Sequence, residues 1–327
     1  MNSISKDIFS IDDEKAFQAQ ALDTFKFQAK NCQVYKEYIH HLKIAVDQVS
    51  SIKQIPFLPI GFFKTHSVLS RQEPIEITFS SSGTTGMVQS SHHVTDVALY
   101  EQSYLCAFEH FYGRVSDYCF LALLPSYQQR AGSSLIYMVN DLIAKSGHPQ
   151  SGYFLENHDD LLHTLTDLKS KKQPTVLIGV TYALLDFIEK FDLHFHELIV
   201  METGGMKGKR KEMVREELHE QLTKGFGVPA IHSEYGMTEL LSQAYSLGEG
   251  VFQCPGWMRI LIRDTNDPLT LIPEGRTGGI NVIDLANINS CSFIATQDLG
   301  RIKLEGNFEV LGRFDNADIR GCNLLVQ

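Results

Sequence analysis

The sequence lacks several features that mark common classes of protein. No stretch reaches the ~20 consecutive apolar residues of a membrane-spanning helix, and the first residues contain no apolar signal core. Basic residues are in the minority, with 29 Lys and Arg against 39 Asp and Glu. This balance disfavours nucleic acid or an anionic membrane as the partner, because neutralising phosphates takes clustered cations. We therefore expect a globular, cytoplasmic protein without stable membrane insertion.

Motifs of familiar metal and catalytic sites are also missing. The six cysteines include no Cys-x-x-Cys pair and no spacing typical of zinc or of a disulfide framework, so we expect reduced thiols. His92-His93 and His194-Phe195-His196 have no third convergent ligand, which disfavours a zinc site. No Gly-x-Ser-x-Gly elbow supports a serine hydrolase, and no Gly-Lys-Ser/Thr ending completes a Walker A loop.

A run of small hydroxyl and glycine residues follows the short apolar stretch Ile77-Thr78-Phe79. The stretch has the β-branched and aromatic character of a strand end. Glycines let backbone N–H groups turn toward an anion, and the hydroxyls add uncharged donors, so the run can form a phosphate-binding loop. An ordinary surface turn is the alternative, because the same residues dominate turns for local reasons. The candidate loop residues are Ser81, Ser82, Gly83, Thr84, Thr85 and Gly86.

Apolar strands alternate with helical patterns through the middle of the chain. Strands are predicted at 120–125, 175–180 and 197–203, and helices follow at 135–144, 182–191 and 209–224. This alternation predicts an α/β domain with a mainly parallel sheet, whose ligands bind at the carboxyl ends of the strands. Amphipathic helices are expected within 12–43, and short alternating segments after residue 257 predict an antiparallel β subdomain.

The expected organisation therefore has three parts. Residues 1–55 form a helical lead-in, residues 56–250 an α/β core that binds nucleotide and acid, and residues 251–327 a β subdomain with a C-terminal tail carrying Cys322.

Four motifs occur in an order that resembles the adenylate-forming superfamily. After Ser-Gly-Thr-Thr-Gly at 82–86 come Tyr-Gly-Met-Thr-Glu at 235–239, Thr-Gln-Asp-Leu-Gly at 296–300 and Gly-Arg-Phe-Asp at 312–315. The resemblance implies the fold of the superfamily's N-terminal domain. The chain ends soon after the last motif, so the C-terminal lid domain of the larger enzymes is expected to be absent.

Within that superfamily the chain resembles acyl-protein synthetases of the LuxE type, which are related to phenylacetate-CoA ligases. The narrower resemblance rests on 56–64, on 130–135, on Thr203-Gly204-Gly205-Met206-Lys207 and on Ile319-Arg320-Gly321-Cys322. It implies ATP-dependent activation of a carboxylic acid, fatty or aryl, to an acyl adenylate. It further implies transfer of the acyl group to an enzyme cysteine and delivery to a partner acyl-CoA or fatty-acid reductase.

The resemblance also assigns roles to single residues. The loop at 81–86 would hold the β- and γ-phosphates, Thr238 would bind the α-phosphate, and Glu239 would bind Mg²⁺, a hard cation that suits a carboxylate plus phosphate oxygens. Tyr235, followed by Gly236, would stack on adenine. Gly204 and Gly205 would let the backbone approach the purine, while Asp298 would accept the ribose hydroxyls beside Arg313.

Each of these residues has a structural alternative. Tyr235 can be a core aromatic, Thr238-Glu239 a helix start, and Arg313-Asp315 a surface ion pair. Cys322 can act as the nucleophile, with Arg320 lowering its pKa, or it can be a small buried apolar residue. Cys106, Cys119 and Cys291 lie in apolar runs and are expected to be structural.

Two other functions stay open. No Lys follows the glycine loop at 87–92, where the superfamily often has one, which weakens the predicted grip on triphosphate. An aryl- or acyl-CoA ligase of the phenylacetate type is the enzymatic alternative, and its thioester product would form without Cys322. A non-catalytic nucleotide-binding scaffold is the other alternative, and it would bind nucleotide without releasing pyrophosphate.

Overall fold

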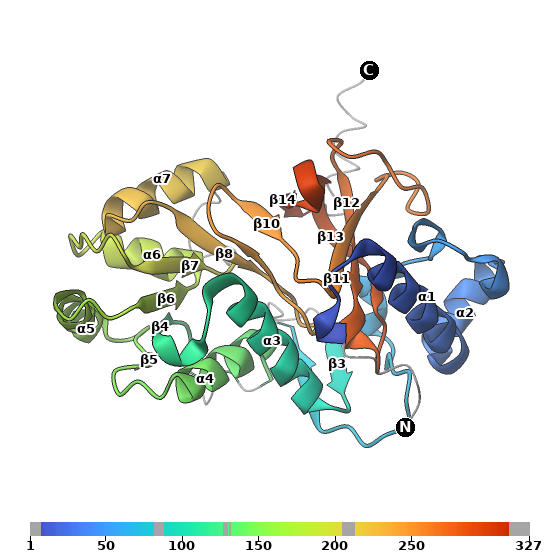
Figure 1. Cartoon of the computed structure of the whole chain (residues 1–327), viewed down its shortest axis with the longest axis horizontal. Coiled ribbons are helices and arrows are strands. Elements are labelled where there is room, and N and C mark those ends of the chain that lie inside the picture. The colour runs from blue at the N-terminus through green and yellow to red at the C-terminus, as the bar shows by residue number, and fades with distance from the viewer. Residues whose placement is uncertain (1–7, 82–87, 127–129, 131, 205–212, 314–327) are drawn as a thin grey trace. The chain divides into compact units, whose positions relative to one another are not determined.

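The computed structural model describes residues 8–81, 88–126, 130, 132–204 and 213–313 (Figure 1). These residues fall into two compact units, each built from separate stretches of the chain. The β unit comprises the described residues up to Tyr100, Glu239–Ser242 and those from Gln253 onward. The α/β unit comprises Glu101–Thr238 and Gln243–Phe252. The predicted three-part organisation stays a prediction.

The α/β unit contains a run of parallel strands in the order β5-β4-β6-β7-β8, and β9 pairs antiparallel with β8. Strands β4 and β6 are buried along their whole length, which accounts for their unbroken apolar sequences. The strands of this unit are β4 (Cys119–Leu123), β5 (Gly152–Tyr153), β6 (Thr175–Gly179), β7 (Ile199–Glu202), β8 (Ile231–Tyr235), β9 (Ala244–Ser246) and β10 (Val251–Gln253), except for Gln253, the last residue of β10, which belongs to the β unit.

Helices cover both faces of these parallel strands. In Figure 1, α3 and α4 lie along one side of the strands, and α6 and α7 lie along the other. Helix α4 begins at the Ser133 N-cap, and Gly147 and Gly227 end α4 and α7 with φ angles of 62° and 64°. The helices are α3 (Val97–Tyr112), α4 (Ser134–Ser146), α5 (His158–Ser170), α6 (Thr181–Ile188) and α7 (Arg215–Phe226).

The β unit is built on the antiparallel order β11-β12-β13-β14, with β1 parallel to β13 and a separate β2–β3 hairpin. The aromatic rings of Phe25 and Tyr35 each lie 6.1 Å from the ring of Phe293, which joins the first two helices to β13. Its elements are α1 (Glu14–Asn31), α2 (Gln33–His41), β1 (Leu58–Pro59), β2 (Ile77–Ser80), β3 (Ser91–Val94), β11 (Met258–Arg263), β12 (Gly278–Asp284), β13 (Phe293–Ile302) and β14 (Phe308–Arg313).

Single 3₁₀ turns connect many of these elements. They are η1 (Ile8–Ser10), η2 (Val46–Gln48), η3 (Ile52–Gln54), η4 (Ile60–Lys64), η5 (Val115–Asp117), η6 (Leu285–Asn287) and η7 (Leu304–Gly306).

The predicted α/β class and the antiparallel strands after residue 257 are confirmed. Two helices occupy 12–43 as expected, and each predicted strand of the middle region is present. The sheet pairing is mixed, however, because β9 runs against β8 and the β-unit strands are mostly antiparallel, so the prediction of a mainly parallel sheet holds only for β4 to β8. No helix in the described ranges is long and apolar enough to cross a bilayer.

Candidate functional site

The β2–β3 hairpin joins Ser81, the first predicted loop residue, to Ser90, which lies after the loop. The backbone N–H of Ser81 donates to the carbonyl oxygen of Ser90 at 3.1 Å, and the N–H of Ser90 donates to Ser81 Oγ at 2.9 Å. Ser81 is therefore an anchor of the loop. The other predicted loop residues lie outside the described residues, and they are Ser82, Gly83, Thr84, Thr85 and Gly86.

The carboxyl group of Glu239, the predicted magnesium ligand, is tied to the same hairpin. Glu239 is 5% exposed, and the Ser90 hydroxyl hydrogen-bonds its side chain. Burial raises the pKa of Glu239, while the Ser90 bond and the positive charges of Arg313 and Lys64 act in the opposite direction. Ser90 thus bonds both Ser81, which the sequence predicted as a phosphate ligand, and Glu239, the predicted magnesium ligand.

The chain that follows Glu239 is fixed by a buried carboxylate at the end of β12. Asp284 Oδ2 accepts the backbone N–H groups of Leu241 and Ser242 at 2.8 and 3.0 Å, and Asp284 Oδ1 accepts the Ser242 hydroxyl at 2.5 Å. The Trp257 indole N–H donates to the same hydroxyl at 3.0 Å. The hydroxyl bridges the carboxylate and the indole, so a satisfied polar network sets the path of this segment.

Asp298 and Arg313 form the pair expected near a ribose. They are direct partners in the β13–β14 register, and Arg313 Nε lies 3.2 Å from Asp298 Oδ1. The Asp298 side chain is 11% exposed and the Arg313 side chain 70%. The backbone N–H of Asp298 also donates to Thr296 Oγ1 at 3.1 Å, so a residue of the same Thr-Gln-Asp-Leu-Gly motif fixes the Asp298 backbone. The arrangement suits a ligand that needs carboxylate acceptors and an accessible guanidinium.

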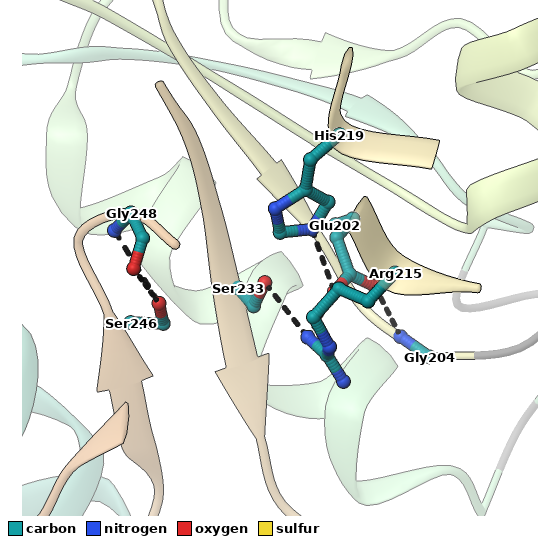
Figure 2. Close-up of polar contacts among 7 residues, drawn as sticks. All are labelled: Glu202, Gly204, Arg215, His219, Ser233, Ser246 and Gly248. Carbon is teal, nitrogen blue, oxygen red and sulfur yellow. Dashed lines mark hydrogen bonds and ion pairs between the residues drawn. The ribbon is translucent and has the colours of Figure 1, made fainter. Parts of the chain in front are cut away.

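In the α/β unit, a buried charge cluster lies at the carboxyl end of β7 (Figure 2). Glu202 Oε1 lies 2.9 Å from Arg215 Nη1, and Glu202 Oε2 accepts the Gly204 N–H at 3.1 Å. The same Arg215 nitrogen donates to Ser233 Oγ at 3.3 Å, and His219 Nε2 lies 3.7 Å from Glu202. Burial opposes ionisation of Glu202, but His219 and Arg215 outweigh it and hold the pKa of this carboxyl below its usual value.

Tyr235 is the last residue of β8, the strand that carries Ser233 of this cluster, and Gly236 follows it. Tyr235 is 8% exposed, and its ring lies 5.9 Å from that of Phe252 at an angle of 63°. A Cβ at Gly236 would come 2.3 Å from Glu234 Oε1, so the turn accepts only glycine while that carboxyl group stays in place. Burial, and the nearby Glu202 charge, raise the pKa of Glu234 to about 8.

The predicted site residues fall into three groups. Ser81, Glu239, Asp298 and Arg313 belong to the β unit, and Gly204, Tyr235, Gly236 and the half-buried Thr238 belong to the α/β unit. Gly205 and Cys322 lie outside the described residues, together with the loop residues named above. Cys119 and Cys291 are fully buried as expected, and Cys106 is half-buried. Over the described ranges, no three His, Cys, Asp or Glu side chains form a metal-binding group.

Several residues that shape the site were not predicted. Ser90 and Glu202 lie next to predicted motifs, and Glu202 carried a usable signal, because an ionisable residue at the end of an apolar strand needs a partner. Asp284 and Asn287 carried no signal, since their contacts reach residues 43 and 48 positions away in the sequence. Arg215 was not predicted either, although its partner Glu202 lies only 13 residues earlier.

Residues 5–103 match the family model described as acyl-protein synthetase, LuxE. The chain is also 37% identical over 75 residues to a curated protein of Photorhabdus luminescens named long-chain-fatty-acid–luciferin-component ligase. That match covers 23% of this chain and 64% of the relative, so it spans less than two thirds of the relative's length.

Solved structures match over a much larger part of the chain. ATP-bound MatB from Rhodopseudomonas palustris has a TM-score of 0.56 at 18% identity, covering 75% of this chain and 49% of that protein. A 2-hydroxyisobutyryl-CoA ligase in its postadenylation state, in complex with 2-HIB-AMP, has a TM-score of 0.69 at 10% identity, covering 93% of this chain and 69% of the ligase. At these identities the likeness shows the fold. The chain thus has the fold of adenylate-forming ligases, and its first third resembles in sequence the acyl-protein synthetases of the LuxE type.

Proposed function

We propose that this protein is an ATP-dependent ligase that activates a carboxylic acid as an acyl adenylate and then carries the acyl group on Cys322. The observation that carries the proposal is the contact of Ser90 with Glu239, because Ser90 also bonds Ser81, the first residue of the predicted phosphate loop, and so ties that residue to a buried carboxyl group. The fold of adenylate-forming ligases and the match to LuxE-type synthetases support the same reaction.

In the proposed first step, a carboxylate oxygen of the acid attacks the α-phosphorus of ATP. An acyl adenylate forms, and pyrophosphate leaves with the electron pair of the broken P–O bond. Thr238 would hold the α-phosphate, and Asp298 with Arg313 would hold the ribose between them. Fixed donors beside the developing charge stabilise the transition state without reorganising during the reaction.

The donor set also suits Mg²⁺, which prefers one or two carboxylates together with phosphate oxygens. Glu239 would hold the ion, and the bound ion would neutralise phosphate charge. The carboxyl group is a candidate for this role because, although burial raises its pKa, the Ser90 bond and the positive charges of Arg313 and Lys64 favour its ionised form, and a bound cation would add to them.

In the proposed second step, the thiolate of Cys322 attacks the acyl carbonyl carbon, a thioester forms, and AMP leaves. A partner acyl-CoA or fatty-acid reductase would then take the acyl group. The name of the Photorhabdus relative supports a long-chain fatty acid as the substrate, and an aryl acid is the alternative. The thiols of Cys32, Cys119 and Cys291 are buried and form no disulfide among the described residues.

Intact-protein mass spectrometry tests this function. Wild type, Cys322→Ala and a Cys106→Ala control are incubated with ATP, Mg²⁺ and a panel of fatty and aryl acids, while pyrophosphate release is followed in parallel. We expect a hydroxylamine-sensitive mass increase in wild type and in the control, and none in Cys322→Ala. The added mass identifies the acid.

A CoA ligase is the second candidate, because 2-hydroxyisobutyryl-CoA ligase structures with bound CoA share the fold. Its signature is an acyl-CoA product that still forms in Cys322→Ala. Nucleotide binding without acid-dependent pyrophosphate release would instead identify a non-catalytic scaffold.

A further inference from the structure

One arginine links the two segments that were predicted to enclose the adenine ring. Arg215, in the first turn of α7, forms the 2.9 Å ion pair with Glu202, and Glu202 in turn accepts the backbone N–H of Gly204 (Figure 2). The Arg215 side chain is 29% exposed and the Glu202 side chain 6%. The position of the Gly204 backbone therefore depends on an ion pair whose carboxylate is almost completely shielded from water.

The same guanidinium also reaches the strand end that carries Tyr235. Arg215 Cζ lies 5.2 Å from the centre of the Phe252 ring, and that ring packs edge-on against Tyr235 at 5.9 Å. Arg215 further donates to Ser233, two residues before Tyr235 on β8. Phe252 lies between the cation and the tyrosine, so a change at Arg215 reaches the Tyr235 ring through one packed side chain.

Glycine at position 250 makes room for this arrangement. A Cβ there would come 2.4 Å from Arg215 Cδ, and the residue has a φ angle of 66°. The backbone thus approaches the arginine stem closely, and the side chain has little freedom to leave its partners.

We propose that Arg215 is a positioning residue for nucleotide, which fixes the Gly204 backbone and the Tyr235 ring in one geometry before the purine binds. The inference rests on the proposed function, because it takes Gly204 and Tyr235 as the adenine contacts. Arg215 does not touch the purine in this scheme. Arg215 restricts the motion of the Gly204 backbone and the Tyr235 ring before the nucleotide binds, so binding loses less conformational entropy. This preorganisation should raise the affinity for the nucleotide and leave the affinity for the acid unchanged.

A purely structural ion pair would give a different result. Loss of a structural pair lowers the unfolding temperature and leaves the affinity of the folded molecules for AMP unchanged. The β unit offers a matched control in Arg259, whose guanidinium lies 4.7 Å from the Phe17 ring and 2.9 Å from Glu14. Arg259→Met removes the same kinds of contact at a place with no predicted nucleotide role.

The experiment measures AMP and ATP dissociation constants by titration calorimetry, without acid, for wild type, Arg215→Met, Arg215→Lys and Arg259→Met. We expect Arg215→Met to weaken AMP binding by ~10-fold, which corresponds to ~1.4 kcal/mol. Arg215→Lys is expected to recover part of the loss, and Arg259→Met to bind AMP as wild type does. Equal AMP affinity of wild type and Arg215→Met would overturn the proposal.

Two further results, a wild type that binds no nucleotide and an Arg215 variant that does not fold, can be distinguished from failure of this proposal. If wild type binds neither AMP nor ATP, the proposed function fails, which is a different result from an unaffected Arg215 variant. If Arg215→Met does not fold, Phe252→Leu decides, because it removes the ring between Arg215 and Tyr235 and keeps the ion pair. An AMP affinity that Phe252→Leu leaves unchanged then counts against the positioning role.

Discussion

The side-chain amide of Asn287 donates a 2.8 Å hydrogen bond to the backbone carbonyl oxygen of Glu239. The other end of the amide, Asn287 Oδ1, lies 3.1 Å from His92 Nε2 on β3, the strand that follows the predicted phosphate loop. Both Asn287 and His92 are almost fully buried. A single amide therefore couples the position of Glu239 to the strand that leaves the loop.

We predict that Asn287→Ala lowers both stability and the apparent affinity for magnesium. The variant leaves a buried carbonyl oxygen without its donor, which costs ~1–3 kcal/mol, and it frees the Glu239 backbone to move. Urea unfolding and the magnesium dependence of pyrophosphate release would measure the two effects. Asn281→Ala is the control, since Asn281 is a buried β12 asparagine that accepts from Arg263 and does not bond to Glu239. If the two variants show the same magnesium dependence, Asn287 does not influence magnesium binding.

Arg313 allows a sharper separation of stability from activity. Its side chain is 70% exposed, and exposed ion pairs contribute under ~1 kcal/mol, so Arg313→Ala should unfold almost as wild type does. If Arg313 contacts the bound nucleotide, the same variant should lose ~10-fold or more in kcat/KM for ATP. Arg114→Ala, which breaks an exposed pair with Asp117, serves as the control. An unchanged kcat/KM would mean that Arg313 forms only a surface ion pair, the alternative that the sequence left open.

The sequence predicted candidate residues that lie in short motifs, and it did not predict residues whose partners lie far away in the chain. The motifs gave Glu239, Asp298, Arg313, Gly204 and Tyr235 as candidates, because each is part of a short run whose residue types are themselves informative. Asn287 was not predicted because its partner lies 48 residues earlier in the chain, and Asp284 was missed for the same reason. Only the folded chain brings such polar groups together, and a buried network leaves no periodic pattern in the sequence.

The sequence likewise predicted the long elements of the fold and missed the short ones. Long apolar strands such as β4 and β6 were recognised, whereas β5, β9 and β10 contain two or three residues and carry no readable period. The mixed pairing follows from β9, whose antiparallel direction depends on a short return of the chain after Ser242 that composition does not encode. Helix α5 did carry a signal, because Leu161, Leu165 and Leu168 recur at helical spacing, and the prediction omitted it.

The approach of Gly250 to Arg215 predicts an unequal pair of glycine substitutions. Gly250 and Gly113 both have positive φ angles, 66° and 86°, so alanine at either position costs ~1–2 kcal/mol in backbone strain. A Cβ at Gly113 meets nothing within 4 Å, whereas at Gly250 it meets the Arg215 stem. We expect Gly250→Ala to be the more destabilising by ~1 kcal/mol or more in urea unfolding. Equal losses would mean that Arg215 moves aside without cost.

Glu234 should make stability fall as pH rises through neutrality. Its folded pKa is about 8 because burial and the neighbouring Glu202 disfavour its charge, while the unfolded group titrates near 4.5. Between these values the folded protein keeps a proton that the unfolded chain has lost, so stability falls by up to ~1.4 kcal/mol per pH unit and levels off above pH 8.

The range from pH 6.5 to 8 isolates this effect, because His232, whose folded pKa burial lowers to about 4, contributes an opposite slope only below its ordinary value of 6.5. Glu234→Gln keeps the shape and removes the charge, so its melting temperature should be nearly flat over that range and should exceed that of wild type at pH 8.5. Glu220→Gln, at an exposed position on α7, should follow the wild-type curve. If the wild type and Glu234→Gln curves run parallel from pH 6.5 to 8, Glu234 is already ionised in the folded protein, and its carboxylate must then have a cationic or hydrogen-bonding partner that offsets the Glu202 charge.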